Sequence, residues 1–390
     1  MRTIPEVDQL MQPLERAITD TFIPALTRGR RLTPNERSVL ALPPRMGGLG
    51  ITNPVDMAKA EHQNSIKLTA ALTQKIRDQN AQDAISMEGQ QRIRLDIEQE
   101  RHQTQQRTLQ HLTPQLSDDL QRRLTMAQEV GASNWLTTLP IRAKGFNLNK
   151  QEFTDALALR YGWPVEGLPE HCACGANYDM NHAMICKKGG FVCIRHDEVR
   201  DVTVKMLQEV CVDVTTEPTL LRLEGERLRY LTANTSPEAR VDISARGFWT
   251  RGQRAFSDIR IFDPMAACHR QQTLEAAHTK NENEKIRAYG ERIQHVDQGS
   301  FTPLVFTTSG GMGPRAKRFY ARLAETLSEK KQQPKSYIVA WMRCRLSFSL
   351  LRSALLCLRG TRSSPLRPVT LTDMDYEATV VESRIDMRLN

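Results

Sequence analysis

The sequence predicts a mixed α/β protein with a mainly helical N-terminal part, and three observations support this fold class. Residues 5–27 carry apolar side chains at helical spacing, and residues 54–78 also read as a helix. Residues 195–307 instead combine amphipathic helices with short runs of β-branched and aromatic residues, which are typical of strands. Between these parts, residues 171–193 hold four cysteines and two histidines, a composition that indicates a metal-binding knuckle.

The composition favours a nucleic-acid partner over a membrane. The chain has 390 residues, enough for two or three domains, and a formal net charge of +9. A basic surplus of this size suits a polyanion. The N-terminal residues lack the apolar core of a signal peptide. The best membrane candidate, 337–358, contains Arg343, Arg345 and Arg352, and three arginines are too costly in hydrocarbon. We expect a buried helix there whose arginines bind nucleic acid, and no membrane partner.

The N-terminal part contains two further signals. Thr33 followed by Pro34 predicts the start of a second helix, which ends at Leu42 before a glycine-rich turn. Residues 79–130 are polar and rich in glutamine and arginine, which is typical of a solvated helical arm or a coiled coil. Such an arm suggests a structural helical adaptor, and its arginines offer a second surface for nucleic acid.

Residues 171–193 contain a candidate zinc site. The four candidate ligands are Cys172, Cys174, His182 and Cys186. Three thiolates and one imidazole form a closed tetrahedral site, so we predict a structural Zn²⁺ ion rather than a catalytic one. The usual knuckle has two residues between its first two cysteines, and this chain has one. His171 or Cys193 is therefore an alternative ligand in place of Cys172 or Cys174.

The segment after the knuckle predicts an acidic site on a small sheet. Its predicted order is helix 195–210, strands 212–218, 239–245 and 256–262, a long polar helix over about 270–296, strand 301–307 and a further helix. Asp242 and Asp258 lie on consecutive strands joined by a short hairpin, so their carboxylates can converge. Two such carboxylates and a backbone carbonyl suit Mg²⁺ or Mn²⁺, which can activate water for attack on a phosphodiester.

These motifs resemble a known family. The order of elements and the two aspartates look like the restriction-endonuclease fold, whose motif is Pro-Asp, then Asp or Glu, one residue, then Lys. With the knuckle just upstream, they resemble the C-terminal region of non-LTR retrotransposon reverse transcriptase polyproteins. Residues 42–65, LPPRMGGLGITNPVDMAKAEHQNS, are similar to the thumb that follows the polymerase palm in that family. The palm motif Tyr-x-Asp-Asp is absent from the sequence, so no polymerase activity is expected.

The resemblance implies a metal-dependent DNA endonuclease that nicks target DNA to prime reverse transcription. Its partners would be target DNA and the element's RNA, in the nucleus. Asp242 and Asp258 would hold Mg²⁺ or Mn²⁺. Relatives place the catalytic lysine on the following helix, four residues before a tyrosine, and Lys285 and Tyr289 match that spacing.

The resemblance also implies further site residues, and the sequence departs from the family motif at two positions. Arg195 and His196 match the basic residue and the histidine that the family has at the start of the first helix. Glu217 is a further candidate, either as a ligand of the metal or as a partner of the catalytic lysine. Val241 stands where the motif has proline, and Arg260 stands where it has lysine. Arg260 and Lys280 are thus alternatives to Lys285.

The resemblance divides the chain into five segments. These are a thumb-like helical remnant at 1–78, a helical linker at 79–165, the zinc knuckle at 166–190, the restriction-like endonuclease at 191–331 with its closing helices, and a C-terminal helix and tail at 332–390. The alternative function is a catalytically inactive or domesticated zinc-knuckle protein that only binds nucleic acid.

Overall fold

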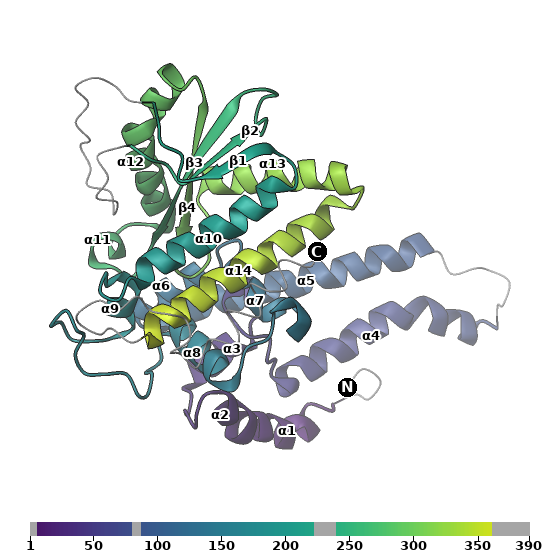
Figure 1. Ribbon diagram of the computed structural model, residues 1–390. Helices are drawn as coiled ribbons and strands as arrows, with labels where there is room; N and C mark the ends of the chain where they lie inside the picture. The colour runs from purple at the N-terminus through teal and green to yellow at the C-terminus, as the bar shows by residue number, and fades with distance from the viewer. Residues whose placement is uncertain (1–5, 80–86, 222–238, 361–390) are drawn as a thin grey trace. The chain divides into compact units, whose positions relative to one another are not determined.

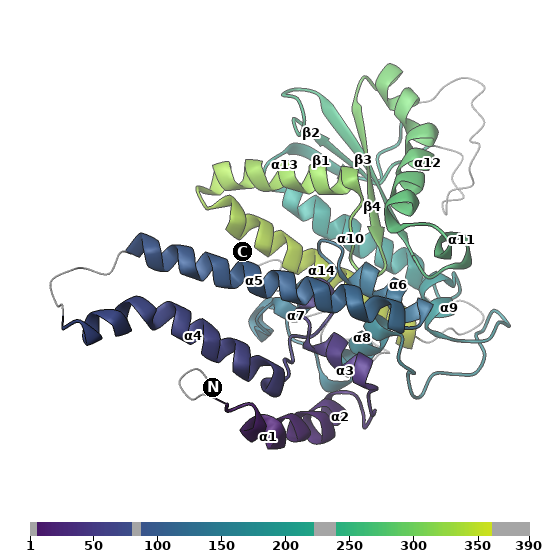
Figure 2. The same ribbon diagram turned by 180° about the vertical axis from the view of Figure 1, so that it is seen from behind.

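The computed structural model describes residues 6–79, 87–221 and 239–360 and divides the chain into two compact units (Figures 1 and 2). The first unit is Met1–Thr125 and the second is Met126–Asn390. The predicted C-terminal tail beyond residue 360 lies outside the described residues. The five predicted segments remain predictions, although the helix assigned to the last segment packs against the α/β core of the second unit.

The described part of the first unit is helical, as the sequence predicts. Its elements are η1 Gln9–Met11, α1 Gln12–Ala17, η2 Ile18–Phe22, α2 Ile23–Leu26, α3 Pro34–Ala41, η3 Pro44–Met46, α4 Pro54–Arg77, α5 Met87–Leu112 and η4 Thr113–Gln115. Thr33 caps α3 in a reciprocal capping box with Glu36, which confirms the predicted start of that helix. Helices α4 and α5 lie side by side, joined by the ion pair between Lys67 and Glu100 at 2.6 Å.

The second unit combines helices with one sheet. Helix α6 Asp118–Ala127 begins in the first unit and ends in the second. Its other helices are α7 Asn134–Thr137, η5 Arg142–Lys144, α8 Lys150–Tyr161, α9 Met180–Ile185, α10 Phe191–Gln208, α11 Ala267–Arg270, α12 Leu274–His295, α13 Pro314–Lys331 and α14 Lys335–Arg359. Its strands are β1 Val212–Thr216, β2 Ile243–Arg246, β3 Arg254–Phe262 and β4 Ser300–Thr307.

The four strands form one mixed sheet in the order β1-β2-β3-β4. The pairs β1–β2 and β2–β3 are antiparallel, whereas β3 and β4 are parallel and place Asp258 opposite Pro303. A parallel pair needs a crossover connection, which α12 supplies. The predicted mixed α/β class is therefore confirmed, with each predicted strand present within a few residues of its expected bounds.

Helices cover both faces of the sheet (Figures 1 and 2). On one face, α12 packs Tyr289 and Ile293 against Phe256 of β3. On the other face, α10, α13 and α14 pack around Ile259 and the buried Leu323. Side chains alternate between the faces of a strand, so the even-numbered residues of β3 point towards α12. This parity directs the side chain of Asp258 to the face that α12 covers.

Helix α8 is fixed at its start by a capping box. The side chain of Asn149 accepts a hydrogen bond from Glu152 N at 2.9 Å, and the Glu152 carboxylate accepts one from Asn149 N at 2.7 Å. We expect Asn149→Ala to lower the free energy of unfolding by about 1 kcal/mol, because an orphaned helical N–H group loses its partner. Urea denaturation measures this change. The exposed neighbour Lys150→Ala is the control and should stay close to wild type, so equal losses in the two variants would contradict the capping role.

Helix α14 confirms the predicted closing helix but not all of its predicted basic face. Arg343 is exposed, and the guanidinium of Arg345 lies 5.1 Å from the Trp341 ring centroid. Arg352 is only 6% exposed and donates a hydrogen bond to Asn147 O at 3.0 Å. The prediction that Arg352 faces nucleic acid is therefore wrong, because the C-terminal half of α14 is buried. No helix in the described ranges is long and apolar enough to span a membrane.

Candidate functional site

The four predicted zinc ligands lie together in the knuckle. Their ligand atoms are all within 4.8 Å of one another. Cys172 Sγ lies 3.6 Å from Cys186 Sγ, and Cys174 Sγ lies 3.4 Å from His182 Nε2. A tetrahedral zinc ion with ordinary bond lengths separates two thiolates by about 3.8 Å. The cluster is thus a Cys₃His set whose chemistry and spacing fit a metal ion such as zinc.

Local backbone structure explains how these ligands meet. Gly175, with φ +90°, closes a turn in which its N–H donates to Cys172 O at 2.8 Å. A hydrogen bond from the backbone of Ala176 lowers the pKa of Cys174, which favours its thiolate. Asp179 caps α9 through the backbone N–H of His182 at 2.6 Å. Each ligand is therefore placed by a turn or by a capped helix rather than by the metal alone.

The alternative ligands stay outside the cluster. His171 is exposed and pairs through its backbone with Asn177, and Cys193 is exposed on α10. Neither belongs to the group of residues whose ligand atoms converge among the described residues. The geometry therefore selects Cys172 and Cys174 over these two alternatives.

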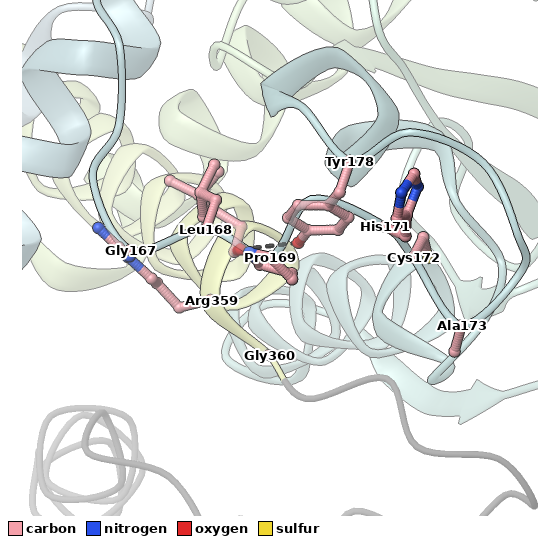
Figure 3. A pocket seen from close by; sticks show the side chains of 10 residues that line it. Gly167, Leu168, Pro169, His171, Cys172, Ala173, Tyr178, Arg359 and Gly360 are labelled. Atoms are coloured by element: carbon pink, nitrogen blue, oxygen red, sulfur yellow. Dashed lines mark hydrogen bonds between the residues drawn. The ribbon is translucent and has the colours of Figure 1, made fainter.

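A cavity of about 290 Å³ adjoins the knuckle (Figure 3). It is lined by residues 167–169, 171–173 and 358–360 together with Tyr178. The hydroxyl of Tyr178 donates to Leu358 O at 2.7 Å, which ties the knuckle to the end of α14. Arg359 makes two hydrogen bonds of 2.8 Å to the buried carboxylate of Asp155. The knuckle is thus packed against α14 and is not an isolated appendage.

A second group of polar residues lies between β3 and α12. Asp258 is only 4% exposed, and Lys285 Nζ lies 2.5 Å from its Oδ2. This buried oxygen has no well-aligned donor in the described part of the chain, so the ion pair with Lys285 is its principal contact. Lys285 Nζ also lies 5.8 Å from the ring centroid of Tyr289, one helical turn further on. The structure therefore brings together Asp258, Lys285 and Tyr289.

Asp242 joins this group from the residue directly before β2, rather than from within a strand as the sequence predicts, because β2 begins only at Ile243. Its Oδ2 accepts hydrogen bonds from Ile259 N at 2.5 Å and lies 3.0 Å from His196 Nε2. Ile259 directly follows Asp258, so the bond places the Asp242 carboxylate beside Asp258. The two predicted aspartates therefore converge at one end of the β2–β3 ladder, with His196 of α10 on one side and Lys285 of α12 on the other.

The electrostatics of the group pair two carboxylates with two basic side chains, Lys285 and His196. Burial raises the pKa of Asp258 to about 6, the charge of Asp242 adds to the rise, and Lys285 opposes it. Burial alone would lower the pKa of Lys285, but the neighbouring Asp258 raises it above its ordinary value. Two carboxylates at such close range repel each other, so additional positive charge near both stabilises their ionised forms.

The pKa of His196 gives a test of this arrangement. Burial alone would lower that pKa, but hydrogen bonds to Asp197 and Asp242 raise it to about 10. The raised pKa stabilises the fold fully below the unfolded value of about 6.5, and this stability is lost as the pH rises towards 10. We expect the free energy of unfolding without added Mg²⁺ to fall between pH 7 and pH 10. The loss should be about 1–3 kcal/mol after allowance for the 29% exposed side chain.

Urea denaturation at several pH values measures this loss. In His196→Gln the fall in stability should be smaller, because the glutamine side chain does not titrate. The exposed His295→Gln on α12 is the control and should keep the wild-type pH profile. Equal pH profiles for wild type and His196→Gln would contradict the assigned ion pair.

Glu217 contacts Asp242 through its backbone, and its carboxylate is held by an arginine that the sequence reasoning missed. Its N–H donates to Asp242 O at 2.9 Å, and its carboxylate lies 2.6 Å from Arg200 Nη1. Arg200 also contacts Asp197, which contacts His196 Nδ1 at 3.2 Å. Helical spacing could have pointed to Arg200, because this residue lies four residues after His196 on a predicted helix and therefore on the same face.

Arg195 and the two alternatives to Lys285 lie elsewhere. Arg195 is 2% exposed and donates to Met184 O at 3.1 Å, away from the carboxylates. Successive helical side chains point about 100° apart, so Arg195 and His196 face different neighbours. Arg260 pairs with Glu284 at 2.9 Å, and Lys280 is exposed. Of the three basic candidates, Lys285 alone contacts Asp258 among the described residues.

A comparison of the chain with protein-family models finds no match, and a comparison with curated proteins finds none either. The class of this protein therefore follows from its fold and its two sites alone. The chain is a mixed α/β protein with a four-stranded sheet, a Cys₃His cluster that can hold a metal ion and a buried acidic site that contains a lysine.

Proposed function

We propose that the chain is a metal-dependent DNA endonuclease with a restriction-endonuclease-like core. The observation that carries the proposal is the convergence of Asp242, Asp258 and Lys285 at one end of an antiparallel strand pair. A mixed sheet between helical layers, with Asp258 on β3 and Asp242 directly before β2, resembles the pattern inferred from the sequence. The basic net charge of +9 suits a nucleic-acid substrate.

The residues at this site fit a divalent cation. Asp258 Oδ2 is buried without a well-aligned donor, and the adjacent Asp242 supplies a second carboxylate. Carboxylate oxygens are the ligands that Mg²⁺ and Mn²⁺ prefer. Asp242 and Asp258 would hold the ion, with Glu217 as a further candidate ligand. When bound, the ion would supply Lewis-acid stabilisation and an activated water.

The protein residues would act on the phosphodiester by position and charge. Lys285, fixed between Asp258 and the Tyr289 ring, would stabilise negative charge that develops on the non-bridging phosphate oxygens. In hydrolysis, the water oxygen bonds to phosphorus, the bond from phosphorus to the 3′ oxygen breaks, and that oxygen takes up a proton. The product is a nick with a 3′-hydroxyl, the group from which a DNA strand can be extended.

The Cys₃His cluster would have a structural role. Four protein ligands close the coordination sphere of a tetrahedral zinc ion, which leaves no position for water or substrate. The cluster also lies on a segment that packs against α14 through Tyr178. We therefore assign zinc to the fold and the chemistry to the aspartates.

A plasmid-nicking assay tests the proposal. Supercoiled DNA should become open circular with zinc-loaded protein and Mg²⁺ or Mn²⁺, and should stay supercoiled without a divalent ion. Lys285→Met should lower the nicking rate by about 10²-fold or more, because a group that stabilises the transition state is lost. The control Lys280→Met removes an exposed lysine from the same helix and should keep the wild-type rate.

A second function, binding of nucleic acid without cleavage, is favoured by one departure from the motif. Arg260 stands at the lysine position and is engaged by Glu284 rather than by Asp258. Folded, zinc-loaded protein that binds DNA with a steep salt dependence but leaves the plasmid supercoiled would support this function and exclude the nuclease. If Lys280→Met and Lys285→Met reduced the nicking rate equally, the assignment of Lys285 to the active site would be wrong.

A further inference from the structure

Arg200 of α10 joins three acidic side chains beside the acidic site. Its side chain is only 12% exposed. Nη1 lies 2.6 Å from Glu217 Oε1 and 3.0 Å from Asp197 Oδ1, and Nε lies 3.0 Å from Asp201 Oδ1. A planar guanidinium offers several donors in fixed directions, so it can hold several carboxylates in one arrangement.

The first of these carboxylates belongs to a residue with a strained backbone. Glu217 has φ +50°, in the left-handed region that a non-glycine residue rarely adopts. Such a conformation persists only where its surroundings enforce it. Here the N–H of Glu217 is bound to Asp242 O and its carboxylate to Arg200. The backbone and the side chain of Glu217 are therefore fixed by two separate contacts, of which Arg200 is one.

The second carboxylate orients the histidine on Asp242. Asp197 Oδ1 contacts both Arg200 Nη1 at 3.0 Å and His196 Nδ1 at 3.2 Å. The other ring nitrogen, His196 Nε2, lies 3.0 Å from Asp242 Oδ2. A carboxylate at each of the two ring nitrogens fixes the orientation of the imidazole ring. The contacts therefore run from Arg200 through Asp197 and His196 to Asp242.

We infer that Arg200 is a positioning residue that sets the affinity of the acidic site for its divalent cation, an inference that rests on the proposed metal-dependent nuclease. One guanidinium fixes both Glu217 and, through Asp197 and His196, the carboxylate of Asp242. Arg200 itself contacts neither Asp258 nor Lys285 in the described contacts. Loss of the Arg200 side chain would therefore change the arrangement of the metal ligands, while Lys285, which would face the phosphate, stays in place.

Arg200→Ala should therefore weaken binding of the cation. Loss of a residue that orients metal ligands typically costs about 10–100-fold in metal affinity. We expect the Mn²⁺ dissociation constant and the Mg²⁺ concentration for half-maximal nicking to rise by about 10-fold or more, while nicking at saturating metal recovers most of the wild-type rate. Arg200→Lys should restore the affinity only in part, because a single ammonium cannot reproduce the planar fork.

The test measures Mn²⁺ binding by electron paramagnetic resonance and nicking across a Mg²⁺ series, with the Cys₃His cluster kept zinc-loaded. Thermal melting and zinc content verify the fold of each variant. Arg37→Ala is the matched control, because Arg37 is also a largely buried arginine in an ion pair, 2.8 Å from Glu15 and in the first unit. Arg37→Ala should keep the wild-type Mn²⁺ affinity.

The outcomes separate this inference from the proposed function. An unchanged Mn²⁺ affinity in Arg200→Ala, or an equal loss in Arg37→Ala, overturns the positioning role. Wild type that binds Mn²⁺ but never nicks DNA refutes the nuclease, while the Arg200 variants still decide the role of Arg200 in metal binding. Wild type that binds no Mn²⁺ outside the zinc site overturns both.

Discussion

Asp258→Ala is expected to reduce plasmid nicking on the order of 10³-fold, to the background of the assay. Asp258 is the buried member of the aspartate pair and contacts Lys285 at 2.5 Å. The substitution removes one candidate metal ligand and leaves the lysine without its partner. Both the cation and the lysine would then lose their positions near the phosphate, so the effect should exceed that of changing either supporting residue alone.

Asp213→Ala provides the matched control for Asp258→Ala. Asp213 lies on β1 of the same sheet, is half exposed and pairs with Arg254. We expect this variant to keep the wild-type nicking rate within a few-fold. The isosteric Asp258→Asn should be as inactive as the alanine variant, with an intact near-ultraviolet circular dichroism spectrum. Nicking that survives in both Asp258 variants would place the active site elsewhere or reveal a contaminating nuclease.

Cys186→Ser is expected to abolish zinc binding and to unfold the knuckle. Cys186 is buried, and its Sγ lies 3.6 Å from that of Cys172. Structural zinc sites contribute about 10–16 kcal/mol of apparent binding free energy in isolated fingers, and this energy is also folding energy. Losing a direct ligand should weaken the metal affinity by more than the roughly 10–100-fold that loss of an orienting partner costs.

Zinc content by elemental analysis and protease sensitivity of residues 166–190 measure this effect. Cys193→Ser is the control, because Cys193 is exposed on α10 and lies outside the cluster. It should retain one zinc ion per chain and the wild-type digestion pattern. Equal zinc loss in the two variants would show that Cys193 is a ligand after all, whereas full zinc content in Cys186→Ser would exclude the proposed Cys₃His set.

Local patterns in the sequence predicted the elements and most of the site. Runs of β-branched and aromatic residues predicted β3, and the family resemblance pointed to Lys285 and Tyr289 on the following helix. The knuckle was predictable because its ligands are close in the chain and two of them lie at a turn and a helix end. Where one short segment decides the geometry, periodicity and residue chemistry were sufficient.

The remaining site residues depend on packing between distant segments. Arg195 and Arg352 carry the same charge as solvent-facing arginines, and only the burial of α10 and α14 determines that they turn inward. Arg200 contacts Asp197 and Asp201 within α10, but it reaches Glu217 only because the segment after β1 lies beside α10. Periodicity shows which residues share a face of a helix, but it does not show which neighbour covers that face.

Helix α10 connects the knuckle to the acidic site, and this connection has a consequence for the zinc-free protein. Phe191, its first residue, is fully buried beside the knuckle residue Met184, and His196 follows within the second turn. Because α10 is continuous from Phe191 to Gln208, the knuckle and His196 are anchored on one helix. Removal of zinc from the knuckle should therefore also disturb the placement of His196 beside Asp242, and a lower Mn²⁺ affinity of the zinc-free protein would reveal that disturbance.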